Sequence, residues 1–460
     1  MTGPSATTQT LAADLLIIGW GKAGKTLAKD LGGRGRRVVL VERDDSLIGG
    51  SCINVACVPT KDLIDSAEHR AGAEPAAYLR QAIASRDSLV TRLRAANRAM
   101  LETVEAVTLI GGEARFTGPH RVRVRGGDET LEITADQIVI NTGSSPLLPD
   151  LPGIDGPNVH TSQSIQHITD LPERLAIIGG GFIAMEFASM FAAFGSQVTV
   201  LERSARFGSG LDGLDDDVRE AVVTALTDRG VRILTGAVVE AIDATGVNTS
   251  AGRIDAEAVL VATGRRPETA ALNLGAAGVA TDERGFIIVD EHLATSVPGI
   301  WAAGDVNGGP QFTYISLDDY RILASQLAGD GSRSTADRSA VPTTTFITPP
   351  LAQVGLTERE ARRQGIDHVV AAKKVADIAA MPRPKILGET HGLIKVLIDP
   401  ATDKVLGATV FSTDAQEVIN LVALAMRAGA TATQLRDGIW THPSSTEALN
   451  EVLATLSAGR

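Results

Sequence analysis

Cysteine is scarce in this chain of 460 residues: the only two are Cys52 and Cys57, and both lie in GGSCINVACVPTK (49–61). So small a number excludes a scaffold of several disulfides and a zinc site closed by four sulfur ligands. Two sulfur atoms alone make a poor metal site, so we expect no resident metal ion. The pair could still be a structural disulfide, half of a metal site, two small buried side chains or a redox couple.

Long apolar runs and a basic, apolar amino terminus are also absent. No stretch approaches the roughly 18–20 apolar residues that a membrane-spanning helix needs. The first residues, MTGPSATTQTLA (1–12), form a short polar tail without the pattern of a secretion signal. We therefore expect a cytoplasmic protein, and structural disulfides are rare in that compartment.

An excess of basic residues is missing too. Lys and Arg number 43 against 55 Asp and Glu, which gives a formal net charge of −12. This balance argues against a nucleic acid partner and against adhesion to an anionic membrane, since both require a basic face. The length of the chain predicts two or three domains.

What the chain does contain is one pattern that occurs twice. Residues 14–44 (DLLIIGWGKAGKTLAKDLGGRGRRVVLVERD) and 174–204 (RLAIIGGGFIAMEFASMFAAFGSQVTVLERS) each combine a β-branched run, a glycine turn, a helical stretch and a strand that ends in Glu. This is the pattern of a βαβ unit. The repeat predicts two nucleotide-binding domains of similar build.

The remaining segments predict an α/β fold with two Rossmann-like domains and a C-terminal α+β domain. Residues 61–104 have a helical pattern, and residues 107–118 and 121–133 alternate like a small antiparallel sheet. From about residue 341, alternating strands are followed by helices. The predicted boundaries are 1–150 for the first part of the first nucleotide domain, 151–271 for the second nucleotide domain, 272–340 for the remainder of the first, and 341–460 for the C-terminal domain.

The first glycine turn has its glycines at Gly19, Gly21 and Gly24. In this fingerprint the first glycine permits the tight turn, the second admits a pyrophosphate, and the third lets the helix pack closely on the strand. The pyrophosphate would sit at the N-terminus of the helix that begins near Lys22. Glu42 ends the next strand, where it can accept hydrogen bonds from both ribose hydroxyls. These features together predict a dinucleotide site.

The second turn has Gly179, Gly180 and Gly181, with Ala184 at the third glycine position, where only close packing matters. Glu202 again ends the following strand. A carboxylate there suits the free 2′-hydroxyl of NAD and repels the 2′-phosphate of NADP. We therefore expect NADH as the preferred cofactor.

Two arginines keep NADPH as the alternative. Arg203 and Arg206 follow Glu202, and a nearby arginine can accommodate a 2′-phosphate. Alternatively, Arg203 and Arg206 are solvated charges on the surface.

Two dinucleotide sites and a close cysteine pair form an electron path. A nicotinamide supplies hydride, a flavin accepts it, and a disulfide receives the electron pair. We expect FAD to bind the first βαβ pattern, because the cysteine motif directly follows the second strand of that pattern.

Four motifs carry a resemblance to a known family. They are the cysteine motif, GGGFIAMEFA (179–188), TGRRPET (263–269) and WAAGDV (301–306). Together they strongly resemble the flavoprotein disulfide reductases, which include glutathione reductase, lipoamide dehydrogenase and mercuric reductase. The resemblance extends from about Ala12 to Leu456. It implies FAD, NAD and interface domains, with the C-terminal domain serving dimerisation in a homodimer.

The resemblance implies a role for each cysteine. Cys52 would be the interchange thiol that attacks the substrate, and Cys57 the charge-transfer thiol that lies against the flavin. Lys61 would lie near the isoalloxazine with Glu186 as its partner on the nicotinamide side, and Asp305 would bind the ribityl chain. The same resemblance implies further cofactor residues: Gly50, Ser51, Thr142, Gly143 and Gly304 for FAD, and Gly264 for NAD(P).

The C-terminal stretch WTHPSSTEALNEV (440–452) contains His442 and, five residues later, Glu447. A histidine oriented by a carboxylate is a good general base near neutral pH. The resemblance implies that it serves Cys52 of the other subunit. A helix-capping region with Ser444 or Ser445 at the N-cap is the plainer interpretation, and it does not compete with catalysis.

Departures from the family narrow the choice of member. Mercuric reductases and large thioredoxin reductases carry further C-terminal thiols, which this chain lacks. Lipoamide dehydrogenases usually have a glycine and a second histidine where this chain has Ala56 and Trp440. Trp440 could narrow the substrate entrance or pack in an interface. Glutathione reductases have arginines along the first helix, where GKAGKTLAKDL (21–31) offers Lys22, Lys25 and Lys29.

Several stretches look like the reactive-chlorine-resistance flavoproteins, a branch close to mercuric reductase. FTYISLDDYRI (312–322) is the most specific of them, because nucleotide binding does not require it. This resemblance implies an NAD(P)H-dependent reductase of a small oxidant or disulfide, with hypothiocyanous acid and Cu(II) as candidate acceptors. The alternatives are a lipoamide dehydrogenase or low-molecular-weight disulfide reductase of the glutathione or mycothiol type, and a non-catalytic flavin redox sensor.

Overall fold

The structure is a computed structural model that describes residues 9–127, 129–208 and 213–456, so most of the predicted polar tail lies outside the described residues. The chain divides into two compact units. The first comprises Met1–Asp62, Ala82–Leu147 and Gly264–Asp337, and the second comprises Leu63–Gln81, Leu148–Thr263 and Arg338–Arg460. The domain boundaries predicted near residues 150, 271 and 340 stay predictions.

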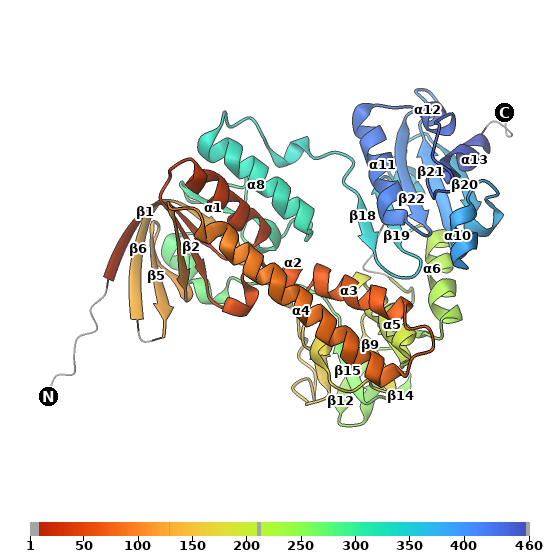
Figure 1. The fold of residues 1–460 in the computed structure, drawn as a ribbon, viewed down its shortest axis with the longest axis horizontal. Coiled ribbons are helices and arrows are strands. Elements are labelled where there is room, and N and C mark those ends of the chain that lie inside the picture. Colours follow the sequence, from red (N-terminus) through yellow and green to blue (C-terminus); the bar gives the residue numbers. More distant parts are fainter. Residues whose placement is uncertain (1–8, 128, 209–212, 457–460) are drawn as a thin grey trace. The chain divides into compact units, whose positions relative to one another are not determined.

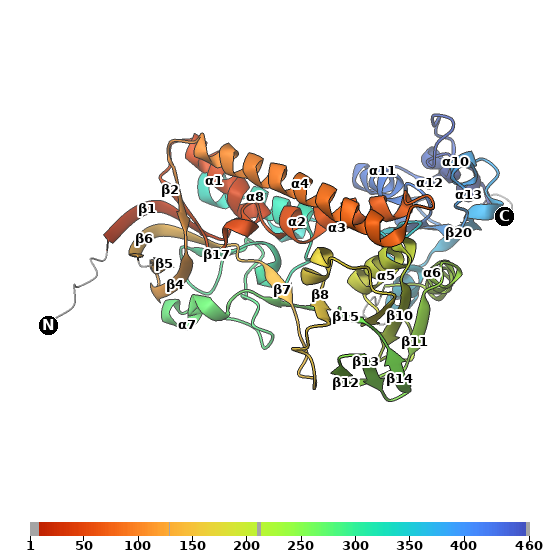
Figure 2. The same cartoon turned by 60° about the horizontal axis from the view of Figure 1, so that its bottom comes forward.

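The first unit is built on one large sheet in the order β3-β2-β1-β6-β5-β4, with β17 also paired to β6 (Figures 1 and 2). Residues Leu15–Ile18 of β1 are buried on both faces, as expected for the centre of a parallel sheet. The strands are β1 (Gln9–Ile18), β2 (Val38–Glu42), β3 (Val107–Gly111), β4 (Glu113–Gly118), β5 (Arg121–Gly126), β6 (Glu129–Ile140) and β17 (Ile300–Ala302).

Two helices of the first unit, α1 (Lys22–Gly33) and α8 (Thr313–Ala328), pack against each other and share one apolar core. Leu27 and Leu31 of α1 and Ile322 of α8 are fully buried in it. A small antiparallel pair, β7 (Ser144–Pro146) and β16 (Arg265–Pro267), completes this unit. The carboxyl ends of β1 and β6 lie beside the N-terminus of α1, where the Gly24 N–H donates to Asn141 Oδ1 just after β6.

The antiparallel sheet predicted for residues 107–133 is confirmed for β4, β5 and β6, but β3 and these three strands belong to the large sheet and do not form a small sheet of their own. β3 pairs in parallel with β2, and β4 to β6 continue the same sheet. The reason is the length of β6, which pairs with β5 on one side and along nearly its whole length with β1 on the other. Alternation of side chains shows which residues face a core, but it does not show which strand lies alongside.

The helical stretch predicted for residues 61–104 is interrupted once. α3 (Cys57–Glu68) ends before Gly72, and α4 (Pro75–Glu102) begins with a proline. The Glu74 carboxylate accepts hydrogen bonds from the N–H groups of Ala76 and Ala77, which satisfies the first turn of α4. The proline and this capping acid explain why two helices form instead of one.

The second unit contains two main sheets. One is fully parallel in the order β11-β10-β9-β15-β8, and the other is antiparallel in the order β18-β19-β22-β21-β20, as predicted for the C-terminal domain. The parallel strands are β8 (Val159–Thr161), β9 (Arg174–Ile178), β10 (Gln197–Glu202), β11 (Arg232–Thr235) and β15 (Ala258–Val261). The antiparallel strands are β18 (Thr343–Thr345), β19 (Leu351–Gly355), β20 (Val369–Lys374), β21 (Leu393–Ile398) and β22 (Val405–Phe411).

Helices and a small meander complete the second unit, and its C-terminal helices cover the antiparallel sheet with one shared core. The meander consists of β12 (Val239–Asp243), β13 (Gly246–Thr249) and β14 (Gly252–Asp255). The helices are α5 (Phe182–Phe194), α6 (Asp216–Asp228), α9 (Glu358–Gln364), α10 (Pro382–Leu387), α11 (Ala415–Ala428), α12 (Ala432–Arg436) and α13 (Ala448–Ala454). Among the described residues, every helix is too short or too polar to cross a membrane.

A buried lysine joins the parallel and antiparallel parts of the second unit. Lys395 of β21 is 3% exposed, and its Nζ lies 3.1 Å from Asp215, 2.8 Å from Asp217 and 2.8 Å from Glu358. Burial acts to lower the pKa of Lys395, but the hydrogen bonds to these carboxylates outweigh burial and raise it. Asp215 also accepts the N–H of Arg359 at the start of α9.

We expect Lys395→Met to lower the free energy of unfolding by about 3–5 kcal/mol, because it leaves the buried Asp215 carboxylate, and the partly exposed Glu358 and Asp217 beside it, without their cation. The matched control is Lys373→Met on β20, whose partner Glu451 is partly exposed; it should cost about 1 kcal/mol or less. Chemical denaturation of both variants measures the difference. Equal stability of the two variants would contradict the role given to Lys395.

Candidate redox active site

The first glycine turn lies between β1 and α1, at the carboxyl edge of the large sheet. Gly19 has φ +100°, and a Cβ there would lie 2.4 Å from the Asn141 carbonyl oxygen. A Cβ on Gly24 would lie 2.8 Å from Ile17, so the third glycine permits close helix–strand packing, as predicted. Gly21 is the N-cap of α1 and has no side chain to cover the first N–H groups. The turn therefore presents the N-terminus of α1 to a ligand.

Glu42 ends β2 beside this turn. Its Oε2 accepts the N–H of Trp20 at 3.0 Å, and its Oε1 accepts the N–H of Arg43 at 2.9 Å. Burial raises the pKa of Glu42, against the lowering effect of these N–H groups. The carboxylate thus fixes the turn at the position predicted for the adenosine ribose.

Asn141 is a residue that the sequence did not single out. It directly follows the last residue of β6. Its Oδ1 accepts the N–H of Gly24 at 2.9 Å, and its Nδ2 donates to the Ala303 carbonyl at 2.6 Å. Its side chain thereby links the phosphate turn to the Gly304–Asp305 segment. The sequence did contain a signal for Asn141: it stands directly before the predicted FAD residues Thr142 and Gly143, at the end of a buried strand.

Asp305 belongs to a polar chain at the same edge of the sheet. Ser144 Oγ donates to Asp305 Oδ2 at 2.6 Å, and Arg265 Nε donates to Ser144 Oγ at 2.8 Å. Burial lowers the pKa of Arg265, and the charges of Asp305 and Cys57 oppose that effect. The motifs TGRRPET and WAAGDV therefore meet in one network within the first unit.

The residues present fit an FAD. The Thr142 hydroxyl is buried and has no hydrogen-bond partner among the described residues, so it is available to a ligand. A Cβ on Gly50 would lie 3.1 Å from the Gly21 Cα, and a Cβ on Gly143 would lie 3.9 Å from the Ser51 Oγ. Gly50 therefore packs on the first glycine turn and Gly143 lies beside Ser51, so these predicted FAD residues lie close together.

The two cysteines lie on consecutive helices. Cys52 is on α2 (Ser51–Asn54) and half-buried, and Cys57 is exposed at the first position of α3. The Cys57 Sγ lies 3.5 Å from the Thr313 hydroxyl at the start of α8. A helix N-terminus favours a thiolate. Cys57 therefore lies where two helix N-termini meet.

Cys57 is the main influence on the acidity of Cys52. A hydrogen bond with Cys57, burial and the negative charge of Cys57 all raise the pKa of Cys52, while Thr313 and Lys25 act to lower it. Cys52 therefore keeps its proton until a base removes it.

Lys61 and Glu186 lie on different units. Lys61 is half-buried on α3, four residues after Cys57. Glu186 is buried on α5, where its Oε1 accepts the N–H of Phe346 at 2.9 Å. Their predicted partnership stays a prediction.

The second glycine turn has the same construction as the first. Gly181 is the N-cap of α5, and Ala184 is fully buried, as the packing position requires. Glu202 ends β10, and a Cβ on Gly180 would lie 2.5 Å from its Oε2. The carboxylate therefore lies over the turn where a nucleotide ribose would bind. Gly264, predicted for NAD(P), lies in the first unit directly before β16.

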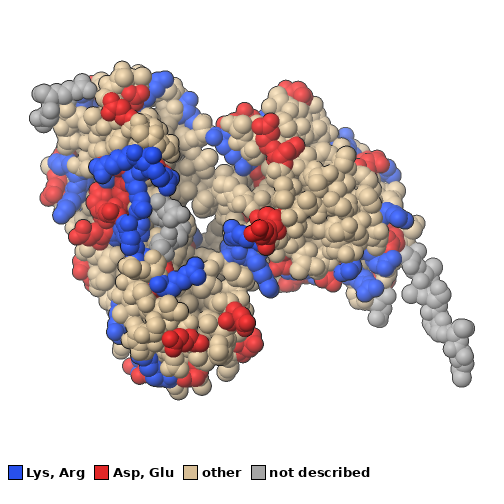
Figure 3. All heavy atoms as spheres, turned by 180° about the vertical axis from the view of Figure 1, so that it is seen from behind, with Lys and Arg blue, Asp and Glu red and all other residues tan. Residues whose placement is uncertain are grey.

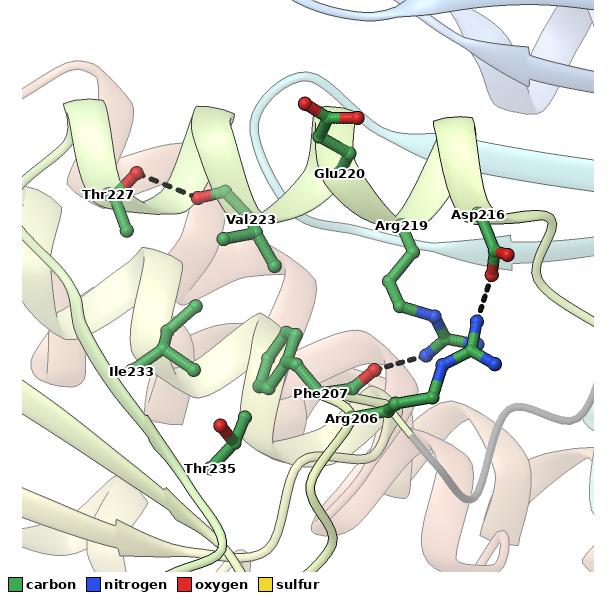
Figure 4. Close-up of a pocket in the computed structure, with 9 residues that line it drawn as sticks. All are labelled: Arg206, Phe207, Asp216, Arg219, Glu220, Val223, Thr227, Ile233 and Thr235. Carbon is green, nitrogen blue, oxygen red and sulfur yellow. Dashed lines mark hydrogen bonds and ion pairs between the residues drawn. The ribbon is translucent and has the colours of Figure 1, made fainter.

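A cavity of about 440 Å³ lies between α6 and β11, beside the end of β10 (Figure 4). Its wall includes Thr235, the strand partner of Glu202. Arg206 reaches across to Asp216, and Arg219 donates to the Phe207 carbonyl. Arg206 is therefore engaged by a carboxylate.

His442 and Glu447 form the predicted pair. The His442 Nδ1 lies 2.9 Å from Glu447 Oε1, and the imidazole is 70% exposed. The N–H of Ser444 and the bond to His442 lower the pKa of Glu447. The carboxylate stays ionised at neutral pH, so it holds the Nδ1 proton and leaves Nε2 free for a substrate or thiol.

The structure bears on two interpretations of residues 440–452, the serine N-cap and the role of Trp440. Neither Ser444 nor Ser445 caps α13, because the helix begins at Ala448 with Glu447 at the N-cap. Trp440 packs against the core of the antiparallel sheet, which supports a packing role.

In the part of the chain that the structure describes, no three His, Cys, Asp or Glu side chains are grouped so as to hold a metal ion. Lys and Arg alternate with Asp and Glu on the face shown in Figure 3.

Comparisons with known proteins agree with this geometry. The family described as pyridine nucleotide-disulphide oxidoreductase matches residues 13–319, and the dimerisation domain of the same family matches residues 341–453. A probable pyridine nucleotide-disulfide oxidoreductase, RclA of Escherichia coli K12, is 43% identical over 95% of this chain and 98% of its own length. The mercuric reductase of Staphylococcus aureus is 35% identical over 95% of this chain and 81% of its own length.

A solved structure is equally similar. The Cu(II) complex of the HOCl-induced flavoprotein disulfide reductase RclA from Escherichia coli has a TM-score of 0.92 and 42% identity, and the match covers 97% of this chain and 100% of that one. These relatives and the two matched domains confirm the predicted α/β fold and the predicted use of FAD and a pyridine nucleotide. The chain belongs to the pyridine nucleotide-disulphide oxidoreductase family and is an oxidoreductase of the flavoprotein disulfide reductase type.

Proposed function

We propose that this enzyme uses NADH to reduce a small oxidant, with Cys52 as the thiol that meets the acceptor. The observation that carries the proposal is the cysteine pair: the chain has no third thiol to relay electrons outward. The half-buried Cys52 and the exposed Cys57, which is the first residue of α3, provide one attacking and one resolving sulfur. A similar protein is described as HOCl-induced, and hypothiocyanous acid is an electrophilic oxidant of the same hypohalous type, which supports it as the acceptor.

The thiol chemistry balances without a further group. The Cys52 thiolate attacks the sulfur of hypothiocyanous acid and releases water after proton uptake, which leaves a thiocyanate-sulfur adduct on Cys52. The Cys57 thiolate attacks the Cys52 sulfur, forms the disulfide and expels thiocyanate. Bound FAD would supply the two-electron chemistry that connects the nicotinamide to this disulfide. Overall, one NADH and one hypothiocyanous acid give NAD⁺, thiocyanate and water.

Protein groups assist these steps. His442 with Glu447 would take the proton of Cys52, because the pKa of that thiol is raised. Each histidine would serve the other subunit of a homodimer, so that a monomer lacks a complete site. Thr142, Gly143, Gly304 and Asp305 would hold the FAD, with the first glycine turn at its pyrophosphate.

The NADH preference rests on Glu202. The buried carboxylate over the second glycine turn repels a 2′-phosphate, and Arg206 is occupied by Asp216.

We also propose that the protein works in the cytoplasm and that the four predicted segments are its domain division.

An acceptor screen on the purified holoenzyme tests the function. We expect rapid NADH consumption with hypothiocyanous acid, much slower consumption with NADPH, and almost none with lipoamide, glutathione disulfide or mycothiol disulfide. Because the similar RclA structure is a Cu(II) complex, Cu(II) is a second acceptor in the screen.

Two other outcomes of the screen would contradict the proposed function. Preferential turnover of lipoamide or a thiol disulfide would contradict the oxidant assignment. Reduction by NADH without transfer to any acceptor would favour the redox-sensor alternative.

A further inference from the structure

Lys25 is a lysine whose side chain lies in the interior of the first unit. It follows Gly24 on α1, is 6% exposed, and is not required by the glycine fingerprint. Its Nζ donates to the Gly49 carbonyl at 2.8 Å and to Asn97 Oδ1 of α4 at 2.6 Å. Asn97 is itself held by its hydrogen bond to the Leu93 carbonyl, at 2.8 Å. One buried cation therefore joins α1, α4 and the turn before the cysteines.

That turn delivers Cys52. Gly49 and Gly50 have φ of +92° and +87°, values that side chains other than glycine rarely adopt, and α2 begins at the next residue. Asn54 Nδ2 donates to the carbonyls of Ile48 and Gly50, each at 2.9 Å. Three successive carbonyls of the turn thus accept hydrogen bonds from buried side chains, and the middle one accepts from Lys25.

The same lysine acts on the charge of the site. Burial lowers the pKa of Lys25 to about 8, the charge of Lys22 on α1 acts in the same direction, and Cys52 on α2 raises it. In return, the protonated lysine acts to lower the pKa of Cys52. A further cation near this turn is Arg94 of α4, whose Nε donates to Asn54 Oδ1 at 2.9 Å. The benefit to the thiolate is present below pH 8 and is lost as the pH rises through that value.

We propose that Lys25 is a positioning residue of the redox site: it fixes the turn that carries Cys52 and supplies positive charge that favours the Cys52 thiolate. The inference rests on the proposed function, in which Cys52 is the attacking sulfur. A lysine with a merely structural role would change the stability of the protein and leave the pH dependence of Cys52 reactivity unchanged.

The test is the rate at which iodoacetamide alkylates Cys52 in the dithiothreitol-reduced holoenzyme, followed by peptide mass spectrometry from neutral to alkaline pH. We expect Lys25→Met to slow alkylation of Cys52 about tenfold at neutral pH, equivalent to a pKa higher by about one unit. Lys25→Arg, which keeps the charge, should restore most of the rate. Lys29→Met removes an exposed charge from the same helix and should retain the wild-type profile.

Every outcome bears on the proposal. A wild-type profile for Lys25→Met, or an equal loss for Lys29→Met, would overturn it. If Lys25→Met does not fold, the same measurement on Asn97→Leu, which removes one of the two anchors of the lysine, decides: an unchanged rate contradicts the proposal. Because alkylation requires no acceptor, a shifted profile beside a failed acceptor screen would leave the role of Lys25 intact and overturn only the choice of oxidant.

Discussion

Replacement of Cys52 by serine is expected to abolish acceptor-dependent NADH oxidation, with a loss of about a thousandfold or more. A serine hydroxyl remains protonated at neutral pH and cannot form a disulfide with Cys57, so neither the attack nor the resolution step can occur. Stopped-flow absorbance should still show NADH bleaching the oxidised flavin, because both nucleotide sites are unchanged.

The matched variant for this experiment is Cys57→Ser. It keeps the attacking sulfur and removes the resolving one, so a single equivalent of oxidant should label Cys52 without turnover. Mass spectrometry of the intact chain would detect that adduct. A Cys52→Ser enzyme with wild-type turnover would overturn the assignment of the two thiols.

The second large effect is expected for His442→Gln, which should lower turnover by about a hundredfold to a thousandfold near neutral pH. Glutamine can still hydrogen-bond to Glu447, but it cannot take a proton from Cys52. The loss should diminish as the pH rises, because solvent hydroxide increasingly deprotonates the thiol. Steady-state rates across the pH range measure this profile.

His69→Gln is the control for that variant. His69 is also exposed and lies 3.6 Å from a carboxylate, that of Asp65, so it matches His442 in exposure and pairing. It should leave turnover unchanged. Similar losses in the two variants would indicate a general effect of removing surface histidines.

A mixed dimer tests whether the active site is shared between subunits. A dimer of one Cys52→Ser chain and one His442→Gln chain has one site with both wild-type residues if each histidine serves its partner. Co-expression of the two inactive variants should then restore about a quarter of wild-type activity, since half of the dimers are mixed and half of their sites are intact. No restoration in isolated mixed dimers would place Cys52 and His442 of one chain in the same site.

Local patterns predicted much of this molecule. The apolar runs at Leu15–Ile18 and Leu175–Ile178, each followed by a glycine turn, indicated the parallel part of the first sheet and the parallel sheet of the second unit, because strands buried on both faces are apolar throughout. His442 and Glu447 were recognisable as a pair because only five residues separate them. In each case the physical cause lies within a short stretch of the chain.

Long-range contacts account for what was missed. Asn141 bonds to Gly24, and Lys395 to Asp215, across more than one hundred residues, and no local pattern records such a partner. Lys25 looked like any lysine on an amphipathic helix, because only the fold brings Gly49 and Asn97 to its ammonium group. The break between α3 and α4 had a visible signal in Pro75, since proline disfavours a helical residue before it.

The central claim is that electrons from NADH reach the acceptor through the Cys52–Cys57 disulfide, and a thiol count tests it most directly. Because the chain has only two cysteines, every reactive thiol belongs to this pair. The denatured oxidised enzyme should show no thiol per chain. The enzyme denatured after anaerobic reduction by NADH should show two, and one equivalent of hypothiocyanous acid should remove both. Two thiols before reduction, or a count that does not respond to NADH while the flavin absorbance does, would contradict the account.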